Sequence, residues 1–494
     1  MYNKISTFLQ KLPQDQWILG LWGLLIISSL LLAVLTEEYL LAGLPLFALL
    51  IYVTVVDFRV IFFLLLASIP ISTEYYLPGG LGTNLPTEPL MVGLMVVFLF
   101  WSIHKVKELN FRALLHPLSL LLILHIAWIY LTTITSDLLW VSVKYALSKT
   151  WYVCAFFFFS LLIFRRSKDF QKAFWYIFIP LFITIIITLT RHAAIGFSFE
   201  MVHTVFHPFH RNHVSYSALL SLFFPILIVA IGWYAPFSGR WWLLILAVPI
   251  FLLGIYFAYT RAGYVALLIA AGAYVVIRMR LMKIAVLGSL VVVVLGVAYL
   301  INDNKYLDYA PNFDRTISHT EFNNLLEATY KGEDISTMER VYRWVAGFNM
   351  IADKPVLGAG PGNFIYFYKP YTVTSFQTYV SKNEDQSGIH SYYLMTAVEQ
   401  GIVGLIIFLL LCAAQLIIGE RVYHQTEDPL LRSIVIAALL CIVVIDAFQI
   451  INDMLETDKM GPFFFISTAL LIKIDLINQR QKTLSHQAKA NDDA

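Results

Sequence analysis

The sequence predicts an all-α polytopic membrane protein with twelve to fourteen transmembrane helices, and three observations support this fold class. Of the 494 residues, 59% are hydrophobic. Only 13% are charged, about half the share that soluble domains carry. The apolar residues gather in runs of roughly 17–25, the length that crosses the hydrocarbon layer of a bilayer as a helix. We therefore expect the chain to cross a membrane repeatedly rather than to fold around a soluble core.

Fourteen apolar runs are candidate spans, of which 58–71 is short, and merging two of them would keep the same orientation. The first run follows a polar start without a convincing cleavage site, which favours an uncleaved first span. The three cysteines lie inside apolar runs, so they indicate neither disulfides nor metal ligands. The runs are 17–36, 39–56, 58–71, 89–104, 114–134, 145–164, 173–190, 213–234, 241–260, 262–277, 283–301, 391–419, 431–452 and 460–476.

The distribution of basic residues predicts the orientation. With both termini in the cytoplasm, 20 of the 34 Lys and Arg fall on inward segments, whereas the outward segment 72–89 has none. Cytoplasmic loops carry an excess of Lys and Arg, so the long segment 302–390 is expected outside. The expected parts are an N-terminal transmembrane bundle (1–301), an outer helical loop (302–390), C-terminal transmembrane helices (391–476) and a polar cytoplasmic tail (477–494).

The outer segment is too polar to cross a membrane, but two of its pieces have the apolar spacing of helices. These are "HTEFNNLLEATYKG" and "ISTMERVYRWVAGFNMIADKP", and Pro355 is expected to end the second. The stretch "VLGAGPGNF" (356–364) then predicts a Gly- and Pro-rich turn at the membrane surface.

Five arginines lie where spans meet the outer surface, and this arrangement predicts an anion site. Arginine offers planar donors that hold phosphate or carboxylate oxygens, most strongly where lipid lowers the dielectric constant. Arg191 and Arg211 could instead extend to the headgroups from helix ends. Arg261 is different, because "TRAG" leaves only a very short turn between two spans, and an ionisable residue at membrane depth indicates function. The five are Arg191, Arg211, Arg261, Arg340 and Arg343.

Histidines form a second group on the outer side. A cluster of histidines can bind zinc, but Glu200 is the only carboxylate beside them, so polar packing at the interface is favoured over a metal site. His390 has a more defined place, at the start of the span that contains Glu399. It is either a helix cap or a general base near neutral pH. The clustered histidines are His192, His203, His207, His210 and His213.

Three segments resemble the O-antigen ligase and polymerase superfamily of bacterial membrane enzymes. They are "YTRAGYVALLIAAG" (259–272), "ERVYRWVAGFNMIADKPVLGAGPGNF" (339–364) and "HSYYLMTAVEQGIVGLIIFLL" (390–410). The family pattern has an Arg that opens a span, then Arg-x-x-x-Trp and Pro-x-x-Gly-x-Gly, then His-Asn and Glu-x-Gly-x-x-Gly. Ser391 stands here where Asn is usual. The segment "FHRNHVSYSALL", with Asn212 and His213, also resembles the polar opening of an earlier family span.

The resemblance implies a GT-C-like membrane glycosyltransferase that works on the periplasmic side of the bacterial inner membrane, without a metal or any other cofactor. Arg261 and Arg340 would stabilise the departing diphosphate, and His390 would take the proton of the acceptor hydroxyl, with inversion at the anomeric carbon. Further candidates for substrate binding are Arg191, Arg211, Asn212, His213, Arg343 and Glu399.

The implied donor is a glycan on undecaprenyl diphosphate, and the expected acceptor is a lipid A–core sugar, since one long late outer loop favours a ligase. The protein would contact membrane lipids and no nucleic acid. An O-antigen polymerase or a protein O-oligosaccharyltransferase would use the same residues. A lipid-linked glycan transporter would need basic groups along the path from the cytoplasmic side, and a structural scaffold would leave the arginines and histidines unexplained.

Overall fold

The computed structural model describes residues 14–76, 82–105, 110–303, 305, 335–376, 381 and 387–492. The chain divides into two units, residues 1–64 and 65–494. In the smaller unit, α2 (Gln14–Thr36), the 3-10 helix η1 (Tyr39–Gly43) and α3 (Leu44–Val56) pack on one another. Helix α4 (Phe58–Ser68) begins in the smaller unit and ends in the larger one. The predicted four-part division of the chain stays a prediction.

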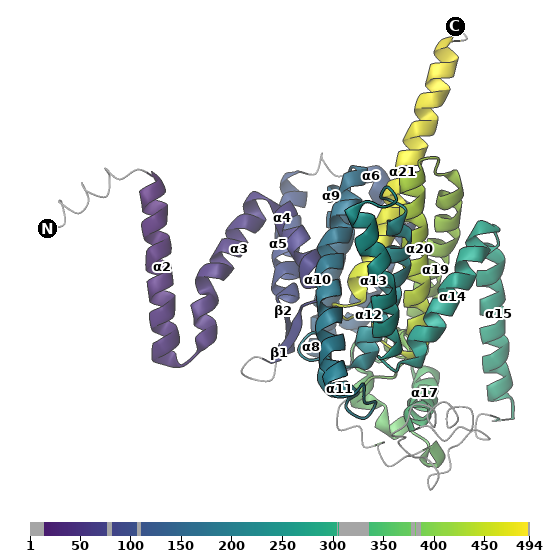
Figure 1. Ribbon diagram of the computed structural model, residues 1–494. Helices are drawn as coiled ribbons and strands as arrows, with labels where there is room; N and C mark the ends of the chain where they lie inside the picture. The colour runs from purple at the N-terminus through teal and green to yellow at the C-terminus, as the bar shows by residue number, and fades with distance from the viewer. Residues whose placement is uncertain are drawn as a thin grey trace. The chain divides into compact units, whose positions relative to one another are not determined.

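The larger unit is a bundle of helices, and the predicted fold class is confirmed (Figure 1). Within the described residues, twelve helices are long and apolar enough to cross a membrane, and Leu41–Val56 and Phe58–Ser68 are shorter apolar helices. The larger unit contains α5 (Thr87–His104), α6 (Phe111–Leu114), α7 (Pro117–Ile134), α8 (Leu139–Tyr152), the π-helix η3 (Val153–Phe158), α9 (Phe159–Ile163), α10 (Ser167–Ala194), α11 (Val202–Val205), α12 (His213–Ile231), α13 (Gly239–Tyr256), α14 (Arg261–Arg278), α15 (Met282–Ile301), α17 (Ile335–Asp353), α18 (Phe364–Phe367), η5 (Lys369–Tyr371), η6 (Thr374–Phe376), α19 (Tyr392–Gln425), α20 (Pro429–Ile451) and α21 (Gly461–Asp492).

The centre of the bundle is α20, on which α12, α14, α19 and α21 pack. Its sequence is apolar on all sides, which is the pattern of a helix surrounded by other helices. It begins cleanly because the Asp428 carboxylate accepts the N–H groups of Leu430 and Leu431, and Pro429 occupies the first turn. In contrast, among the described side chains of α15 only Met282, at its start, is buried.

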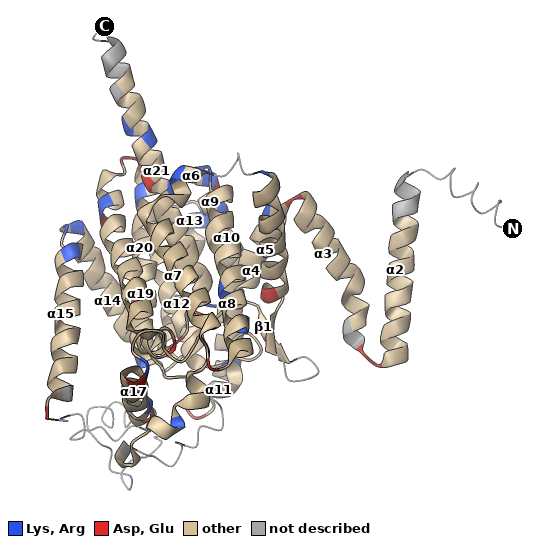
Figure 2. Ribbon diagram, turned by 180° about the vertical axis from the view of Figure 1, so that it is seen from behind, with Lys and Arg blue, Asp and Glu red and all other residues tan. Residues whose placement is uncertain are grey.

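The polar segment after α4 contains a feature that the sequence did not predict. Strands β1 (Thr73–Tyr76) and β2 (Gly82–Leu85) pair antiparallel, with Thr73 opposite Leu85 and Tyr76 opposite Gly82. The hairpin lies at the same end of the bundle as α11 and α17 (Figure 1), which we call the α17 end. Basic residues gather mainly at the opposite end (Figure 2), and the orientation of the chain in a membrane stays a prediction.

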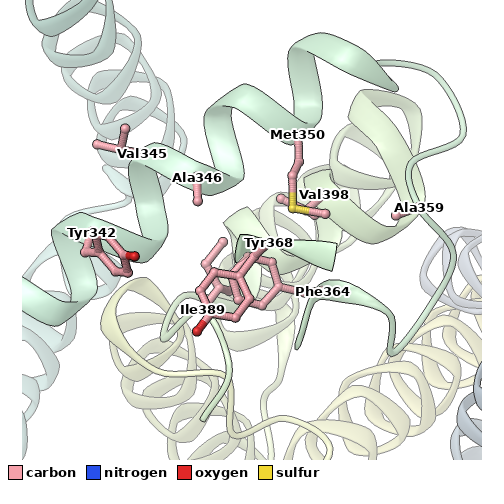
Figure 3. Close-up of a cluster of buried hydrophobic side chains, with 9 residues drawn as sticks. All are labelled: Tyr342, Val345, Ala346, Met350, Ala359, Phe364, Tyr368, Ile389 and Val398. Carbon is pink, nitrogen blue, oxygen red and sulfur yellow. The ribbon is translucent and has the colours of Figure 1, made fainter. Parts of the chain in front are cut away.

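The described part of segment 302–390 packs over a small apolar core that it shares with the start of α19 (Figure 3). The predicted second helix is confirmed as α17, whereas "HTEFNNLLEATYKG" lies outside the described residues. Buried side chains of α17 meet residues from the following loop and from the start of α19. The cluster consists of Tyr342, Val345, Ala346, Met350, Ala359, Phe364, Tyr368, Ile389 and Val398.

A break in α19 receives the predicted Gly- and Pro-rich turn. Gly401 has φ +72°, outside the helical range, and a side chain there would collide with the backbone of Val356. Around the break, the N–H groups of Ala359 and Gly360 donate to the carbonyls of Val398 and Glu399, at 2.9 Å each. The turn therefore replaces hydrogen-bond partners that a continuous helix would supply.

The last span and the described part of the predicted C-terminal tail form one helix. Helix α21 continues without interruption to Asp492. This polar stretch is therefore an extension of the last span.

We expect Gly401→Ala to destabilise the protein, because the new methyl group would need a left-handed backbone and the space of Val356. The loss should be at least about 1–3 kcal/mol, measured as a lower melting temperature in detergent. Gly272→Ala is the matched control. It lies within α14 with no atom near the added methyl group, and should keep or slightly raise the melting temperature. Equal melting temperatures for the two variants would contradict this account of the break.

Candidate active site

One face of α17 docks on the segment that precedes α19. Positions 340, 343, 344 and 347 share a face of the helix by their i, i+3, i+4, i+7 spacing. Arg343 Nη1 donates to the Gly388 carbonyl at 3.0 Å, and Trp344 Nε1 donates to the Ile389 carbonyl at 3.1 Å. Arg340 Nε donates to the carbonyl of Ile451, the last residue of α20, at 3.2 Å. The predicted Arg-x-x-x-Trp element is thus a docking face.

The opposite side of the same segment is held by the loop between α20 and α21. The backbone N–H of His390 donates to the Asp453 carboxylate, and that of Tyr392 donates to the Asn452 carbonyl at 3.0 Å. A side chain at Gly388 would collide with the Asp453 carboxylate. His390 itself adopts φ +56°, a left-handed conformation that is uncommon for residues other than glycine. Contacts on both sides of the segment therefore fix the direction of the imidazole.

Electrostatics keep the imidazole of His390 neutral. Burial and, as smaller causes, the nearby charges of Arg340 and Arg343 together lower its pKa to about 3. Arg343 is itself buried and pairs with Glu339, one turn earlier in α17, with Nη2 3.3 Å from Oε2. Burial raises the pKa of Asp453, while hydrogen bonds from the backbone and the same two arginines oppose that rise.

Glu399 holds the Gly- and Pro-rich turn in the structure. It is 2% exposed, and its two oxygens accept the N–H groups of Gly362 at 2.8 Å and Phe364 at 3.1 Å. The two Gly-containing motifs, which are far apart in the sequence, are therefore parts of one structural unit. These contacts indicate a role for Glu399 in positioning this loop.

Arg261 is the first residue of α14, at the α17 end of the bundle, with its side chain partly exposed. The hydroxyl of the preceding Thr260 donates to the carbonyl of His213, the first residue of α12, at 3.4 Å. Asn212 caps α12, because its side chain accepts the N–H of Ser215 at 2.9 Å. The starts of α12 and α14 thus bring Arg261 together with Asn212 and His213.

The remaining two predicted arginines have other neighbours. Arg191 Nη1 donates to the carbonyl of His207, so it ties the end of α10 to the loop before α12. Arg211 is exposed and lies near the β-hairpin. Its charge opposes the rise in the pKa of Tyr76 that the hydrogen bond from Tyr76 to Glu74 causes.

The clustered histidines do not converge on one point within the described part of the chain. His192 Nε2 lies 3.2 Å from the Ser198 carbonyl, and His210 is buried against the Tyr216 ring, where burial lowers the pKa of its imidazole. The side chain of His203 lies outside the described residues. Among the residues described, no group of three or more His, Cys, Asp or Glu could hold a metal ion.

Sequence reasoning did not single out the polar groups of the α20–α21 loop or their partners. Lys149 is 1% exposed and donates to Glu456 Oε1 at 2.5 Å and to the Tyr392 hydroxyl at 3.0 Å. Tyr145 and Tyr392 donate to the same oxygen at 2.8 and 2.7 Å. The available signal was "NDMLETDKM" (452–460), in which three acidic residues and a lysine stand between two apolar spans.

We expect Glu399→Gln to destabilise the turn, since the amide can accept only one of the two N–H groups and directs a donor at the other. The cost should be about 1–3 kcal/mol, measured as a lower melting temperature and faster proteolysis within 355–364. Glu88→Gln serves as the control, because its partners are the side chains of Thr83 and Asn84, which can reorient. An unchanged turn in Glu399→Gln would argue against this structural role.

Comparison with known proteins connects this geometry to a family. Residues 246–409 match the family model described as O-antigen ligase, which is about a third of the chain. No curated protein matches the chain. The matched part runs from α13 into α19 and supports a glycan ligase- or polymerase-type function. Arg261, Arg340, Arg343 and His390 all fall within it, so the predicted resemblance to the O-antigen ligase and polymerase superfamily is confirmed for this membrane protein.

Proposed function

We propose that the protein is an O-antigen ligase. It transfers a glycan from undecaprenyl diphosphate to a sugar of lipid A–core, with inversion and without a metal ion. The observation that carries the proposal is His390, held in a left-handed conformation beside Arg340 and Arg343 inside the matched region. A base next to fixed cations is the arrangement that transfer from a lipid diphosphate requires.

The arginines act on the leaving group. Negative charge develops on the bridging oxygen as the bond from the anomeric carbon to the diphosphate breaks. Fixed guanidinium groups stabilise that charge, with bidentate hydrogen bonds to the phosphate oxygens. Arg340 and Arg261 are assigned this role, with Arg343 and Arg211 in support. Asn212, His213 and Arg191 shape the neighbouring surface of the donor site, and Glu399 positions the turn.

His390 accepts the proton of the acceptor hydroxyl as that oxygen attacks the anomeric carbon. In the free protein, burial and the two arginines hold the pKa of His390 at about 3, so the imidazole is neutral but a weak base. A bound diphosphate offsets the charges of Arg340 and Arg343 and therefore raises the pKa of the imidazole. The donor thus makes the base stronger at the moment when transfer becomes possible.

The proposed location is the bacterial inner membrane, with both termini in the cytoplasm and the α17 end in the periplasm. The gathering of basic residues at the other end of the bundle supports this orientation. The donor lipid would then reach the site from the outer leaflet.

The decisive experiment gives purified protein the undecaprenyl-diphosphate glycan with separate lipid A–core, glycan and peptide acceptors, in the presence of a chelator. We expect transfer to lipid A–core. We expect His390→Ala to reduce the rate by about 10²–10⁴-fold and Arg261→Ala or Arg340→Ala by about 10²–10³-fold. Transfer only to glycan or peptide would instead identify a polymerase or a protein O-oligosaccharyltransferase. Strict dependence on a divalent metal, or movement of donor across the bilayer without transfer, would contradict the proposal.

The pH dependence of kcat/KM provides a separate test, since it reports groups of the free enzyme. Activity is lost when His390 becomes protonated, and Arg340 lowers the pKa of His390. Arg340→Gln should therefore shift the acidic limb of the profile to higher pH, towards the ordinary value near 6.5. Arg240→Gln, at the opposite end of the bundle, should leave the limb where it is. If the acidic limb of the profile does not move in Arg340→Gln, then His390, with a pKa lowered by Arg340, is not the catalytic base.

A further inference from the structure

The loop between α20 and α21 contains a carboxylate that the mechanism above does not use. Glu456 Oε1 accepts hydrogen bonds from Lys149, Tyr145 and Tyr392. Within the described residues, no hydrogen bond to Glu456 Oε2 is formed. A carboxylate oxygen offers about two acceptor positions, so Oε1 is saturated while the full capacity of Oε2 is available.

Lys149 and Glu456 form an ion pair whose two side chains differ in exposure. The Lys149 side chain is 2% exposed, whereas that of Glu456 is 22% exposed. The lysine is enclosed by the rings of Tyr392 and Phe465, with its Nζ 5.5 and 5.7 Å from their centroids. The network therefore anchors the carboxylate from within the bundle and leaves its outer side accessible.

The segment 388–392 connects this carboxylate to His390. Its carbonyls at 388 and 389 bond to α17, which carries Arg340 and Arg343. Its N–H groups at 390 and 392 bond to Asp453 and Asn452, in the loop that carries Glu456. The hydroxyl of Tyr392 also bonds to Glu456, so the segment that carries His390 contacts α17 and, through Tyr392, Glu456.

We propose that Glu456 Oε2 binds a hydroxyl of the acceptor sugar, next to the hydroxyl that His390 deprotonates; this inference rests on the proposed function. A carboxylate repels a diphosphate but accepts strong hydrogen bonds from neutral hydroxyls. In a displacement with inversion, the nucleophile and the leaving group occupy opposite sides of the anomeric carbon. Arg340 and Arg343 are assigned to the leaving group, which a carboxylate would repel, so Glu456 is assigned to the acceptor.

The main test uses Lys149→Met/Glu456→Met, which removes both charges and leaves neither one buried alone. Replacing a buried ion pair by apolar residues of similar volume is often neutral for stability, so this variant is expected to fold. We expect its melting temperature and its binding of the lipid-diphosphate glycan to match those of the wild type. The KM for the acceptor should rise by about tenfold or more, with kcat changed by no more than a few fold. Asp137→Asn/Lys354→Met, which removes an ion pair at the exposed end of α17, is the matched control and should leave the acceptor KM unchanged.

Acceptor analogues that lack one hydroxyl at a time identify the contact. One analogue should bind the wild type about tenfold more weakly than the intact acceptor does. The double variant should bind that analogue no more weakly than it binds the intact acceptor. If every deletion has the same effect on both proteins, or if donor binding falls instead of acceptor binding, the proposal is wrong.

Direct binding of the acceptor to the purified protein, measured without donor, separates this proposal from the proposed function. A protein that binds the acceptor through Glu456 but transfers nothing under the conditions above would contradict only the transferase proposal. A protein that transfers normally and binds the acceptor equally well in wild-type and double-variant forms would contradict only the role of Glu456. Tyr145→Phe removes a single donor to Oε1 and should affect acceptor binding much less than loss of the carboxylate.

Discussion

The arrangement of the site depends on the five-residue segment 388–392, which is held from both sides. Side chains of α17 take its carbonyls, and the α20–α21 loop takes its N–H groups. A short segment with neither helical nor sheet partners would otherwise leave these groups without hydrogen bonds, which is costly in a low-dielectric setting. The left-handed backbone of His390 follows from this double attachment.

The bundle supplies the rigidity that the attachment needs. Helix α20 is surrounded by four other helices, and its last carbonyl receives Arg340. The break at Gly401 allows the turn 355–364 to pack against α19, and Glu399 secures that turn. His390, the arginines of α17 and the turn are therefore anchored to the membrane helices through short connections.

The fold class could be predicted from sequence because a run of about twenty apolar residues has few structural solutions in a bilayer. Helix α17 followed from local apolar spacing, and its Arg-x-x-x-Trp element followed from the family resemblance. The partners of His390 could not be predicted, since Asp453 is distant in sequence and lies in a loop that hydropathy describes only as polar. Lys149 shows a second limit: it lies inside the predicted span 145–164, where nothing local indicates that it is buried and paired with Glu456, 307 residues later. The backbone partners of Glu399 could not be predicted either, because nothing local indicates that its carboxylate binds N–H groups 37 and 35 residues earlier.

The length of α21 determines how far its C-terminal end lies from the bilayer. A continuous helix of 32 residues is about 48 Å long, whereas the hydrocarbon layer is about 30 Å thick. Because α21 begins at the α17 end, the excess of roughly three turns projects beyond the opposite boundary of the bilayer as a stiff rod. A probe attached near Asp492 would therefore be held at a defined distance from the membrane. The end of a flexible segment would instead contact the membrane surface at many positions.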